Sequence, residues 1–231
     1  MGQRLAALER RVIGCRLCPR LVEHREHMGR VKRPSYAGWE YWSRPVPGFG
    51  DPSASLLVVG LAPAAHGANR TGRLFSGDLS AKFLMGALYQ AGFANQPTSE
   101  YRGDGLELRD TYICAAVRCV PPGDRPTTEE QQACLPYLVS EMGILPRVQT
   151  VLALGHVAFR ACMRALAHIK GEPVKGAFSH GARYDLGEAL PHVVASYHPS
   201  PRNTNTGRLS KDEFVALLLE IRQSLGRGES R

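Results

Sequence analysis

Four short apolar runs, separated by segments with helical periodicity, constrain the fold of this chain most strongly. The first run, 55–61 (SLLVVGL), is apolar at nearly every position, as in a strand buried on both faces of a parallel sheet. Because strands that alternate with helices pack as a sheet covered on both sides, we expect an α/β fold with three α/β/α layers and a mainly parallel four-stranded central sheet. The predicted strands are 55–61, 110–117, 148–154 and 193–197, and the predicted helices 79–91, 127–142, 156–167 and 210–225.

The chain length of 231 residues fits one domain, 1–231, whose first 50 residues differ from the rest. That segment combines a short amphipathic helix, a Cys-x-x-Cys pair and an irregular aromatic and proline-rich stretch, 34–52. Residues 226–231 are expected to form a disordered tail. Since neither a signal peptide nor an apolar run long enough to span a bilayer is visible, we expect a soluble cytoplasmic protein with no membrane partner.

The charge balance favours a polyanionic partner. The chain carries 29 Lys and Arg against 21 Asp and Glu, a net charge of +8. Cations that neutralise phosphates release condensed counterions, which favours binding to nucleic acid. Many basic proteins bind none, so the basic group Arg30, Lys32 and Arg33 is interpreted as a solvated surface, and Trp39 and Trp42 as packing residues.

Four of the six cysteines have the spacing of a metal site. Cys15 and Cys18 form one pair, and Cys119 and Cys134 flank a proline-rich loop that would bring them together. In a reducing compartment such cysteines bind metal more often than they form disulfides, although a chance pair beside buried small side chains is the alternative. Four thiolates suit zinc and a [4Fe-4S] cluster alike, and a closed set of four indicates a structural centre. Such a centre would join the N-terminal segment to the helix that carries Cys134.

Two loops follow the first and the last predicted strands, at the sheet edge where α/β folds bind ligands. The first, GLAPAAHGANRTGRLFSGD, spans 60–78 and lacks both the GxGxxG and the GxxxxGK[ST] patterns of nucleotide sites. Arg70 and Arg73 are candidates for phosphate contact, and Phe75 offers a stacking face. Asp78 is the only carboxylate of this loop, and its alternative role is to cap the helix that follows.

The second loop, YHPSPRNTNTGR, spans 197–208 and places a histidine where a strand ends. The imidazole of His198 can donate a hydrogen bond to a developing oxyanion. A polar turn is the alternative interpretation of the residues that follow. As a loop that enters a DNA groove, it would hold phosphates or base edges with Arg202, Asn203, Thr204, Asn205 and Thr206.

These loops, in this order and together with the cysteines, resemble the uracil-DNA glycosylase superfamily, and within it the iron–sulfur members of family 5, the type-b enzymes. The first loop resembles the family's first motif, and HPSPRNTNT its second. The resemblance covers nearly the whole chain, from Cys15 to the last helix. It implies a [4Fe-4S] cluster, with zinc as the less favoured alternative, on Cys15, Cys18, Cys119 and Cys134.

Two departures place the chain within that superfamily. Other branches carry a polar residue that activates water where Ala64 and Ala65 stand here, so the resemblance assigns catalysis to Asp78. Family 4 has an asparagine that reads uracil where this chain has Ala115. Losing that amide should relax base selectivity, as the range of the family (uracil, hydroxymethyluracil, hypoxanthine and ethenocytosine) indicates.

The resemblance implies a prokaryotic, monomeric enzyme that flips the base out of double-stranded DNA and hydrolyses its glycosidic bond. His198 would stabilise the uracil O2 anion, and Asp78 would hold the attacking water and offset the sugar cation. No lysine is placed as a Schiff-base nucleophile, so we expect monofunctional action that leaves an abasic site. The residues expected to contact the base are Gly60, Ala62, Ala65, Gly67 and Phe75, and those expected to contact DNA are Arg70, Arg73, Arg202, Asn203, Thr204, Asn205 and Thr206.

Two other classes of function are weighed against this one. A non-catalytic, metal-bearing protein that binds damaged or abasic DNA would share the charge, the cysteines and the second loop, but would not need Asp78 and His198. A zinc nucleotide deaminase is disfavoured because its HxE and PCxxC motifs are absent from the sequence.

Overall fold

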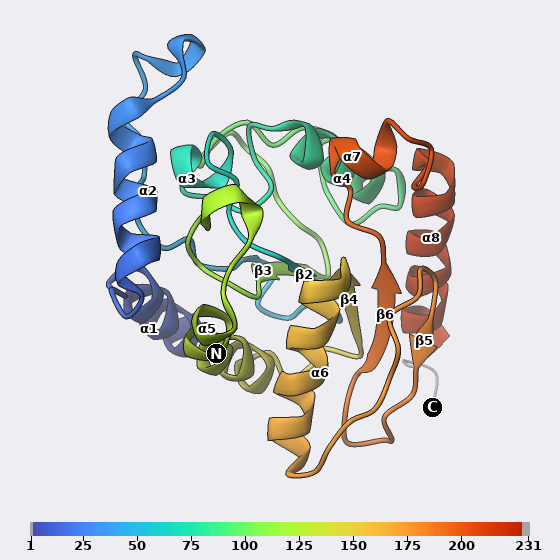
Figure 1. Ribbon diagram of the computed structural model, residues 1–231. Coiled ribbons are helices and arrows are strands. Elements are labelled where there is room, and N and C mark those ends of the chain that lie inside the picture. The colour runs from blue at the N-terminus through green and yellow to red at the C-terminus, as the bar shows by residue number, and fades with distance from the viewer. Residues whose placement is uncertain (1, 228–231) are drawn as a thin grey trace.

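A computed structural model describes residues 2–227, and four parallel strands form the centre of the fold (Figure 1). The strands are β2 (Leu56–Gly60), β3 (Thr111–Ala115), β4 (Thr150–Leu154) and β6 (His192–Ser196). They lie side by side in the order β3-β2-β4-β6, and each neighbouring pair is parallel. The predicted mainly parallel central sheet is therefore confirmed.

Two short antiparallel strands extend this sheet at its edges. β1 (Phe49–Gly50) pairs with β3, and β5 (Arg183–Tyr184) pairs with β6, so the sheet of the described chain has six strands. The sequence analysis did not predict either, and β1 lies in the stretch interpreted as irregular. A strand of two residues is too short to show the alternation from which strands are predicted.

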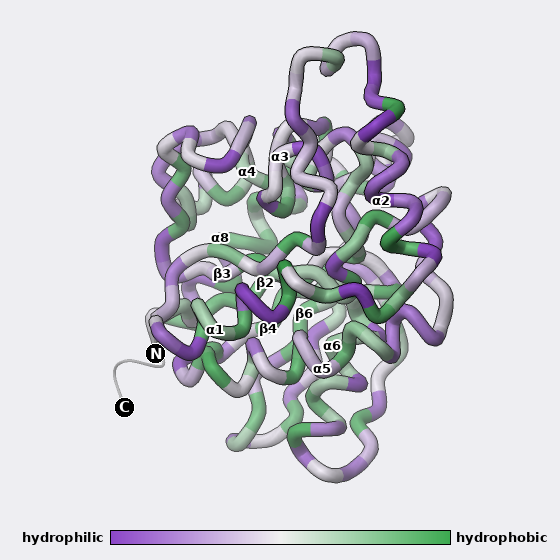
Figure 2. Tube along the Cα trace, turned by 90° about the vertical axis from the view of Figure 1, so that its left-hand side faces the viewer, coloured by the Kyte–Doolittle hydropathy of each residue, from purple (hydrophilic) through white to green (hydrophobic). Residues whose placement is uncertain are grey.

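Helices cover both faces of the sheet, which gives the three predicted layers. α4 (Leu79–Gln90) and α8 (Lys211–Arg227) lie on one face, and α5 (Thr128–Ile144) and α6 (His156–Lys170) on the other. Successive strand residues point to opposite faces, so that Leu56 and Val58 pack with α4 and α8 while Leu57 and Val59 pack with α5 and α6. Figure 2 shows the resulting hydrophobic interior. Among the described helices, none is long and apolar enough to cross a membrane.

The predicted capping boxes form at the starts of α5 and α8. Thr127 accepts a hydrogen bond from the Glu130 amide, and the Glu130 carboxylate accepts one from the Thr127 amide. Ser210 and Glu213 make the same reciprocal pair before α8. These local bonds satisfy amides that a helix leaves free, and they explain why both starts were predictable.

The N-terminal segment folds as two helices, α1 (Gly2–Ile13) and α2 (Pro19–Val31), of which the second was not predicted. α1 packs against α5, and the bidentate ion pair of Arg20 with Glu130 joins α2 to α5 at 2.7 Å and 2.8 Å. Gly226 and Arg227 belong to α8, which corrects the predicted start of the tail, and the rest of that tail lies outside the described residues. Short helical turns complete the structure at η1 (Pro34–Tyr36), α3 (Ala68–Thr71), η2 (Pro122–Asp124) and α7 (Pro201–Thr204).

A buried ion pair joins the loop that follows β3 to α5. Arg118 and Glu141 are 1% and 2% exposed, and two hydrogen bonds join them, that from Nη1 to Oε1 at 3.1 Å. The Arg118 carbonyl also accepts a bond from the Val46 amide at 2.7 Å, so this arginine connects three segments. Neither charge reaches solvent, and each therefore depends on the other for compensation.

We expect Glu141→Gln to destabilise the protein by about 3–5 kcal/mol, because the Arg118 charge then stays buried without a counter-charge. The double variant Arg118→Met/Glu141→Leu removes both charges and should recover most of that loss. Urea unfolding followed by circular dichroism measures both values. Exposed ion pairs contribute less than about 1 kcal/mol to stability. A loss of stability below about 1 kcal/mol for Glu141→Gln would therefore contradict the structural role of this pair.

Candidate active site

The two predicted catalytic side chains line one small cavity at the carboxyl ends of the parallel strands. Asp78 begins α4, and His198 lies two residues beyond β6. The cavity has a volume of about 50 Å³. Its lining residues are Gly60, Ala62, Ala64, Ala68, Leu74, Phe75, Asp78, Ser80, Ala115 and His198.

Asp78 has both of the roles that the sequence analysis weighed against each other. Its Oδ1 caps α4 by accepting a hydrogen bond from the Ala81 amide at 2.8 Å. Its Oδ2 lies against Gly67, where an added Cβ would come within 2.1 Å of that oxygen. Burial raises the pKa of Asp78, against the opposite effect of hydrogen bonds from the Ala81 and Ser80 amides. The result is a fixed and poorly solvated carboxylate.

His198 is held by its backbone and desolvated at its ring. Its carbonyl accepts hydrogen bonds from the Ser200 amide and from the Asn203 side-chain amide, both at 2.8 Å. Burial lowers the pKa of His198 to about 4, so the imidazole is neutral near pH 7. A neutral imidazole still donates one hydrogen bond.

Phe75 fills the space between the first strand end and His198. Its ring stacks on the His198 ring, with centroids 5.9 Å apart and planes inclined by 27°. At Gly60 a Cβ would lie 2.8 Å from Phe75 Cε2, so only glycine allows this ring position. Phe75 has a φ of +48°, which is strained for a bulky residue. Because ligand cavities usually measure about 300 Å³ or more, we expect Phe75 to move when a base enters.

The structure does not bring every predicted base contact to this cavity. Gly60, Ala62 and Phe75 line it, whereas Ala65 and Gly67 do not. Gly67 instead allows the close approach of the Asp78 carboxylate.

Arg70 and Arg73, which were predicted to hold DNA phosphates, are buried and paired within the protein. That role stays a prediction. Arg70 Nε donates to the His66 carbonyl at 2.7 Å, and its guanidinium lies 4.1 Å from the ring centres of both Tyr36 and Trp39. Arg73 pairs with Asp104 through two bonds of 2.6 Å and 2.8 Å. Tyr36, Trp39 and Asp104 lie some thirty residues away in the sequence, and loop composition gave no sign of them.

The second loop folds as the helical turn α7, and most of its side chains stabilise the turn itself. Asn203 holds His198, Thr204 Oγ1 donates to the Ser200 carbonyl at 3.2 Å, and Thr206 Oγ1 donates to the Arg202 carbonyl at 2.7 Å. Arg202 and Asn205 are exposed. Thr206 is exposed as well, although its hydroxyl is used within the turn.

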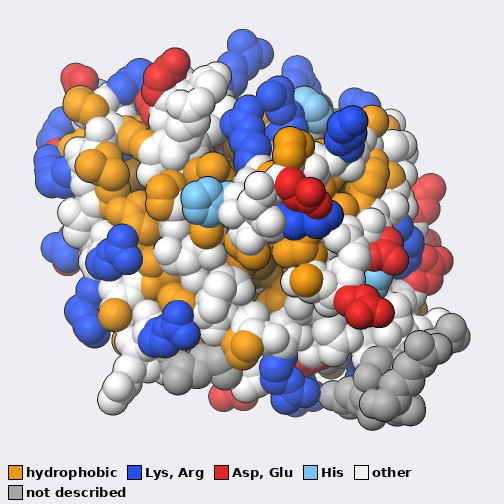
Figure 3. Space-filling view, turned by 90° about the horizontal axis from the view of Figure 1, so that it is seen from below, with side chains coloured by type: hydrophobic (Ala, Val, Ile, Leu, Met, Phe, Trp, Pro, Cys, Tyr) orange, Lys and Arg blue, Asp and Glu red, His pale blue; other side chains and the backbone are white. Residues whose placement is uncertain are grey.

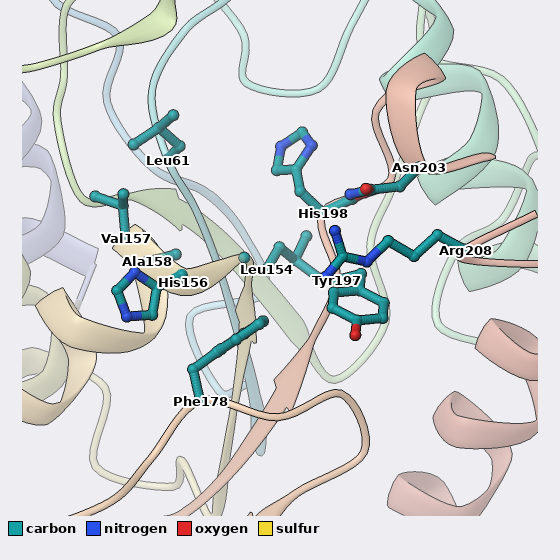
Figure 4. A pocket seen from close by; sticks show the side chains of 11 residues that line it. Leu61, Leu154, His156, Val157, Ala158, Phe178, Tyr197, His198, Asn203 and Arg208 are labelled. Carbon is teal, nitrogen blue, oxygen red and sulfur yellow. The ribbon is translucent and has the colours of Figure 1, made fainter. Parts of the chain in front are cut away.

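A second cavity of about 390 Å³ adjoins the first and shares His198 with it (Figure 4). Its walls are formed by the ends of β4 and β6, the start of α6 and the loop that carries Phe178. Arg208 lies across the Tyr197 ring at 4.2 Å from its centre. The sequence analysis missed Tyr197 and Phe178. The position of Tyr197 directly before His198 was a usable signal, whereas the loop around Phe178 has no periodicity.

The four predicted ligand cysteines lie near one another beneath α2. Cys119 and Cys134 are buried with Leu21 and Val117, and Cys18 packs against them. Burial raises the pKa of Cys119 to about 11, and the neighbouring Cys15 and Cys18 thiols add to this rise. Within residues 2–227, no group of three or more His, Cys, Asp or Glu side chains is arranged to hold a metal ion.

The other two cysteines, Cys114 in β3 and Cys162 in α6, belong to the core cluster between the sheet and α5 and α6. Both are fully buried and serve as small apolar side chains.

Comparison with known proteins agrees with this geometry. Residues 47–222 match the family model of the uracil DNA glycosylase superfamily. The chain is 48% identical to the type-5 uracil-DNA glycosylase of Thermus thermophilus over 92% of this chain and 94% of the relative. It is 46% identical to the type-5 enzyme of Pyrobaculum aerophilum (90% and 88%) and 31% identical to the type-4 enzyme of that organism (70% and 74%). The chain therefore belongs to the uracil-DNA glycosylase superfamily, within the family of its type-5 enzymes.

Proposed function

We propose that this protein is a monofunctional glycosylase of DNA repair that removes uracil from double-stranded DNA and leaves an abasic site. The observation that carries the proposal is the pair Asp78 and His198 on one small cavity, with a fixed carboxylate and a neutral imidazole. Non-catalytic binding to damaged DNA needs neither group. None of the described residues that line the cavity is a lysine, which supports hydrolysis without a Schiff base.

The two groups suit the charges that develop when the glycosidic bond breaks. The sugar gains positive charge and the departing base gains negative charge. His198 would donate a hydrogen bond to the base O2. Because the imidazole is already neutral, it can act as this donor without first losing a proton. Asp78 would orient the attacking water through Oδ2, since Oδ1 already accepts the Ala81 amide. Both interactions are strengthened by the low dielectric of a buried site.

We expect Asp78→Asn to lower the rate of uracil release by about a hundredfold or more, because the amide keeps the helix cap but loses the carboxylate. His198→Ala should cost about 100-fold to 1,000-fold by removing the donor to the departing base. Single-turnover release of uracil from a U·G duplex, followed by alkaline cleavage of the abasic site, measures both. His168→Ala, at the exposed end of α6, is the matched control.

Stability measurements separate the cap from the chemistry. Because folding raises the pKa of Asp78, the stability linked to its protonation is present below the unfolded value and is lost as the pH rises through the folded value. Asp78→Asn should therefore be at least as stable as the wild type at neutral pH, whereas Asp78→Ala loses about 1 kcal/mol of cap. A wild type that binds abasic DNA but releases no base would instead support the damage-binding alternative. Strand scission without alkali would refute monofunctional action.

We further propose that the base range extends beyond uracil to hypoxanthine, hydroxymethyluracil and ethenocytosine. Ala115 lines the cavity directly beside Gly60, to which it is paired across β2 and β3. Its methyl group offers no hydrogen bond to a base edge. A site without a polar side chain here rejects other bases weakly, because no buried group is left unpaired when a different edge enters.

Ala115→Asn is expected to shift selectivity towards uracil by about tenfold or more, because bases that do not pair with the new amide leave it buried and unsatisfied. Ala115→Leu, which has a similar shape without the amide, is the matched control and should lower all substrates together. Excision of the four bases from otherwise identical duplexes gives the ratios. If both variants show the same ratio of uracil excision to excision of the other three bases, this position does not set selectivity.

We also propose that Cys15, Cys18, Cys119 and Cys134 hold a structural [4Fe-4S] cluster. Four cysteines are the residue types that bind such a cluster, and Arg25 supports the proposal. Arg25 is 2% exposed, donates through Nη1 to Cys119 Sγ at 2.9 Å, and makes no ion pair with a carboxylate among the described residues. A buried cation of this kind needs a negative partner, which thiolates bound to a metal centre would supply.

Cys119→Ser should lose iron and sulfide and lower the melting temperature, because the N-terminal helices lose one of their links to α5. Cys162→Ser changes a buried cysteine outside the set. It is the control and should keep iron and sulfide. Iron, sulfide and zinc per chain, with thermal melting, are measured on protein purified without oxygen. Zinc in place of iron would favour the alternative metal, and a wild type free of both would refute the centre. The predicted monomeric state stays a prediction.

A further inference from the structure

A protruding segment beside the active site carries basic side chains that the mechanism does not use. Residues 30–39, here called the basic finger, run from the end of α2 through the turn η1. Figures 1 and 2 show this segment projecting beyond the rest of the molecule, on the side to which the central strands point and next to α3. DNA that presents a base to the cavity at the strand ends must approach from the same side.

The exposed side chains of the basic finger are unusual for a surface turn. Val31 is 59% exposed and Trp39 is 37% exposed. Arg30 and Arg33 are exposed, and neither side chain makes a hydrogen bond or ion pair with any residue from 2 to 227. By contrast, the face where the strands begin shows acidic and basic side chains interspersed (Figure 3). The finger thus offers two cations without protein partners among the described residues, together with the exposed Val31 and Trp39 side chains.

The finger is fixed to the catalytic loop. Arg70 lies between Tyr36 and Trp39, donates to the His66 carbonyl, and donates through Nη2 to the Gly77 carbonyl at 3.2 Å. Gly77 directly precedes Asp78. Within the finger, Lys32 Nζ donates to the Ala37 carbonyl at 3.3 Å. A ligand held by the finger is therefore placed at a defined position relative to the catalytic carboxylate.

We propose that the basic finger binds the sugar-phosphate backbone of the duplex that flanks the flipped nucleotide, with Arg30 and Arg33 on phosphates and Val31 against a sugar. Charge complementarity carries this assignment, since free arginines on a projecting turn match the polyanion that approaches this face. The inference rests on the proposed function, in that DNA is the substrate. It replaces the interpretation of Arg30 and Arg33 as a merely solvated surface.

Salt dependence of DNA binding tests the proposal. Each phosphate contact contributes about 0.9 to the slope of log K against log salt. Arg30→Gln/Arg33→Gln should therefore reduce that slope by about 2. The matched control is Arg10→Gln/Arg11→Gln, which removes the same charge from exposed positions on α1 and should leave the slope unchanged.

The probe is a duplex with a tetrahydrofuran abasic-site analogue, titrated by fluorescence anisotropy between about 50 and 200 mM NaCl. Melting temperatures equal to that of the wild type show that both double variants are folded. Equal slopes for the two double variants would overturn the finger contact. Because the probe cannot be cleaved, this result is independent of uracil release. If the slope does not change but uracil excision is intact, the finger contact alone is refuted. If the protein binds DNA but excises no base, the proposed function alone is refuted.

Discussion

The contact of Gly67 with the Asp78 carboxylate is the constraint on which the active site depends. A Cβ at position 67 would lie 2.1 Å from Oδ2, so no other residue allows the loop to close over this oxygen. The remaining oxygen is held by the Ala81 amide at the start of α4. The carboxylate is therefore fixed from two sides by main chain. Its position follows from the fold and not from a flexible side-chain partner.

Burial then acts on the two catalytic groups in opposite directions, and the difference is useful for the reaction. It raises the pKa of Asp78 and lowers that of His198 to about 4. Near pH 7 the lowered pKa leaves the His198 imidazole neutral, while hydrogen bonds from the Ala81 and Ser80 amides favour the ionised form of Asp78. The site thus places a negative charge where the sugar becomes positive, and an uncharged donor where the base becomes negative. Two positive groups would compete for the departing base, and two carboxylates would raise each other's pKa.

How much the sequence predicted depended on whether the cause was local. The four parallel strands are apolar runs, and the starts of α5 and α8 are capping boxes within four residues, so each was readable from neighbouring positions. Asp78 and His198 were located because both follow strand ends in loops that resemble known motifs. The roles of Arg70 and Arg73 were not predictable. Whether a long guanidinium points outward depends on partners such as Trp39 and Asp104, which only the tertiary structure brings together. The two-residue strands β1 and β5 were missed for a similar reason, because they exist only through pairing with β3 and β6.

The internal use of the first-loop arginines determines where DNA must be held. The guanidinium groups of Arg70 and Arg73 contact carbonyls, aromatic rings and Asp104. These contacts keep the loop rigid around Asp78. Asn203 is likewise committed to His198. We propose that a phosphate backbone that reaches this face meets exposed cations, which are Arg202 on α7 and Arg30 and Arg33 on the basic finger. This division has a physical advantage. Side chains that fix the catalytic geometry stay desolvated and ordered, while those that bind the polyanion keep their hydration until DNA arrives and can respond to salt without disturbing the site.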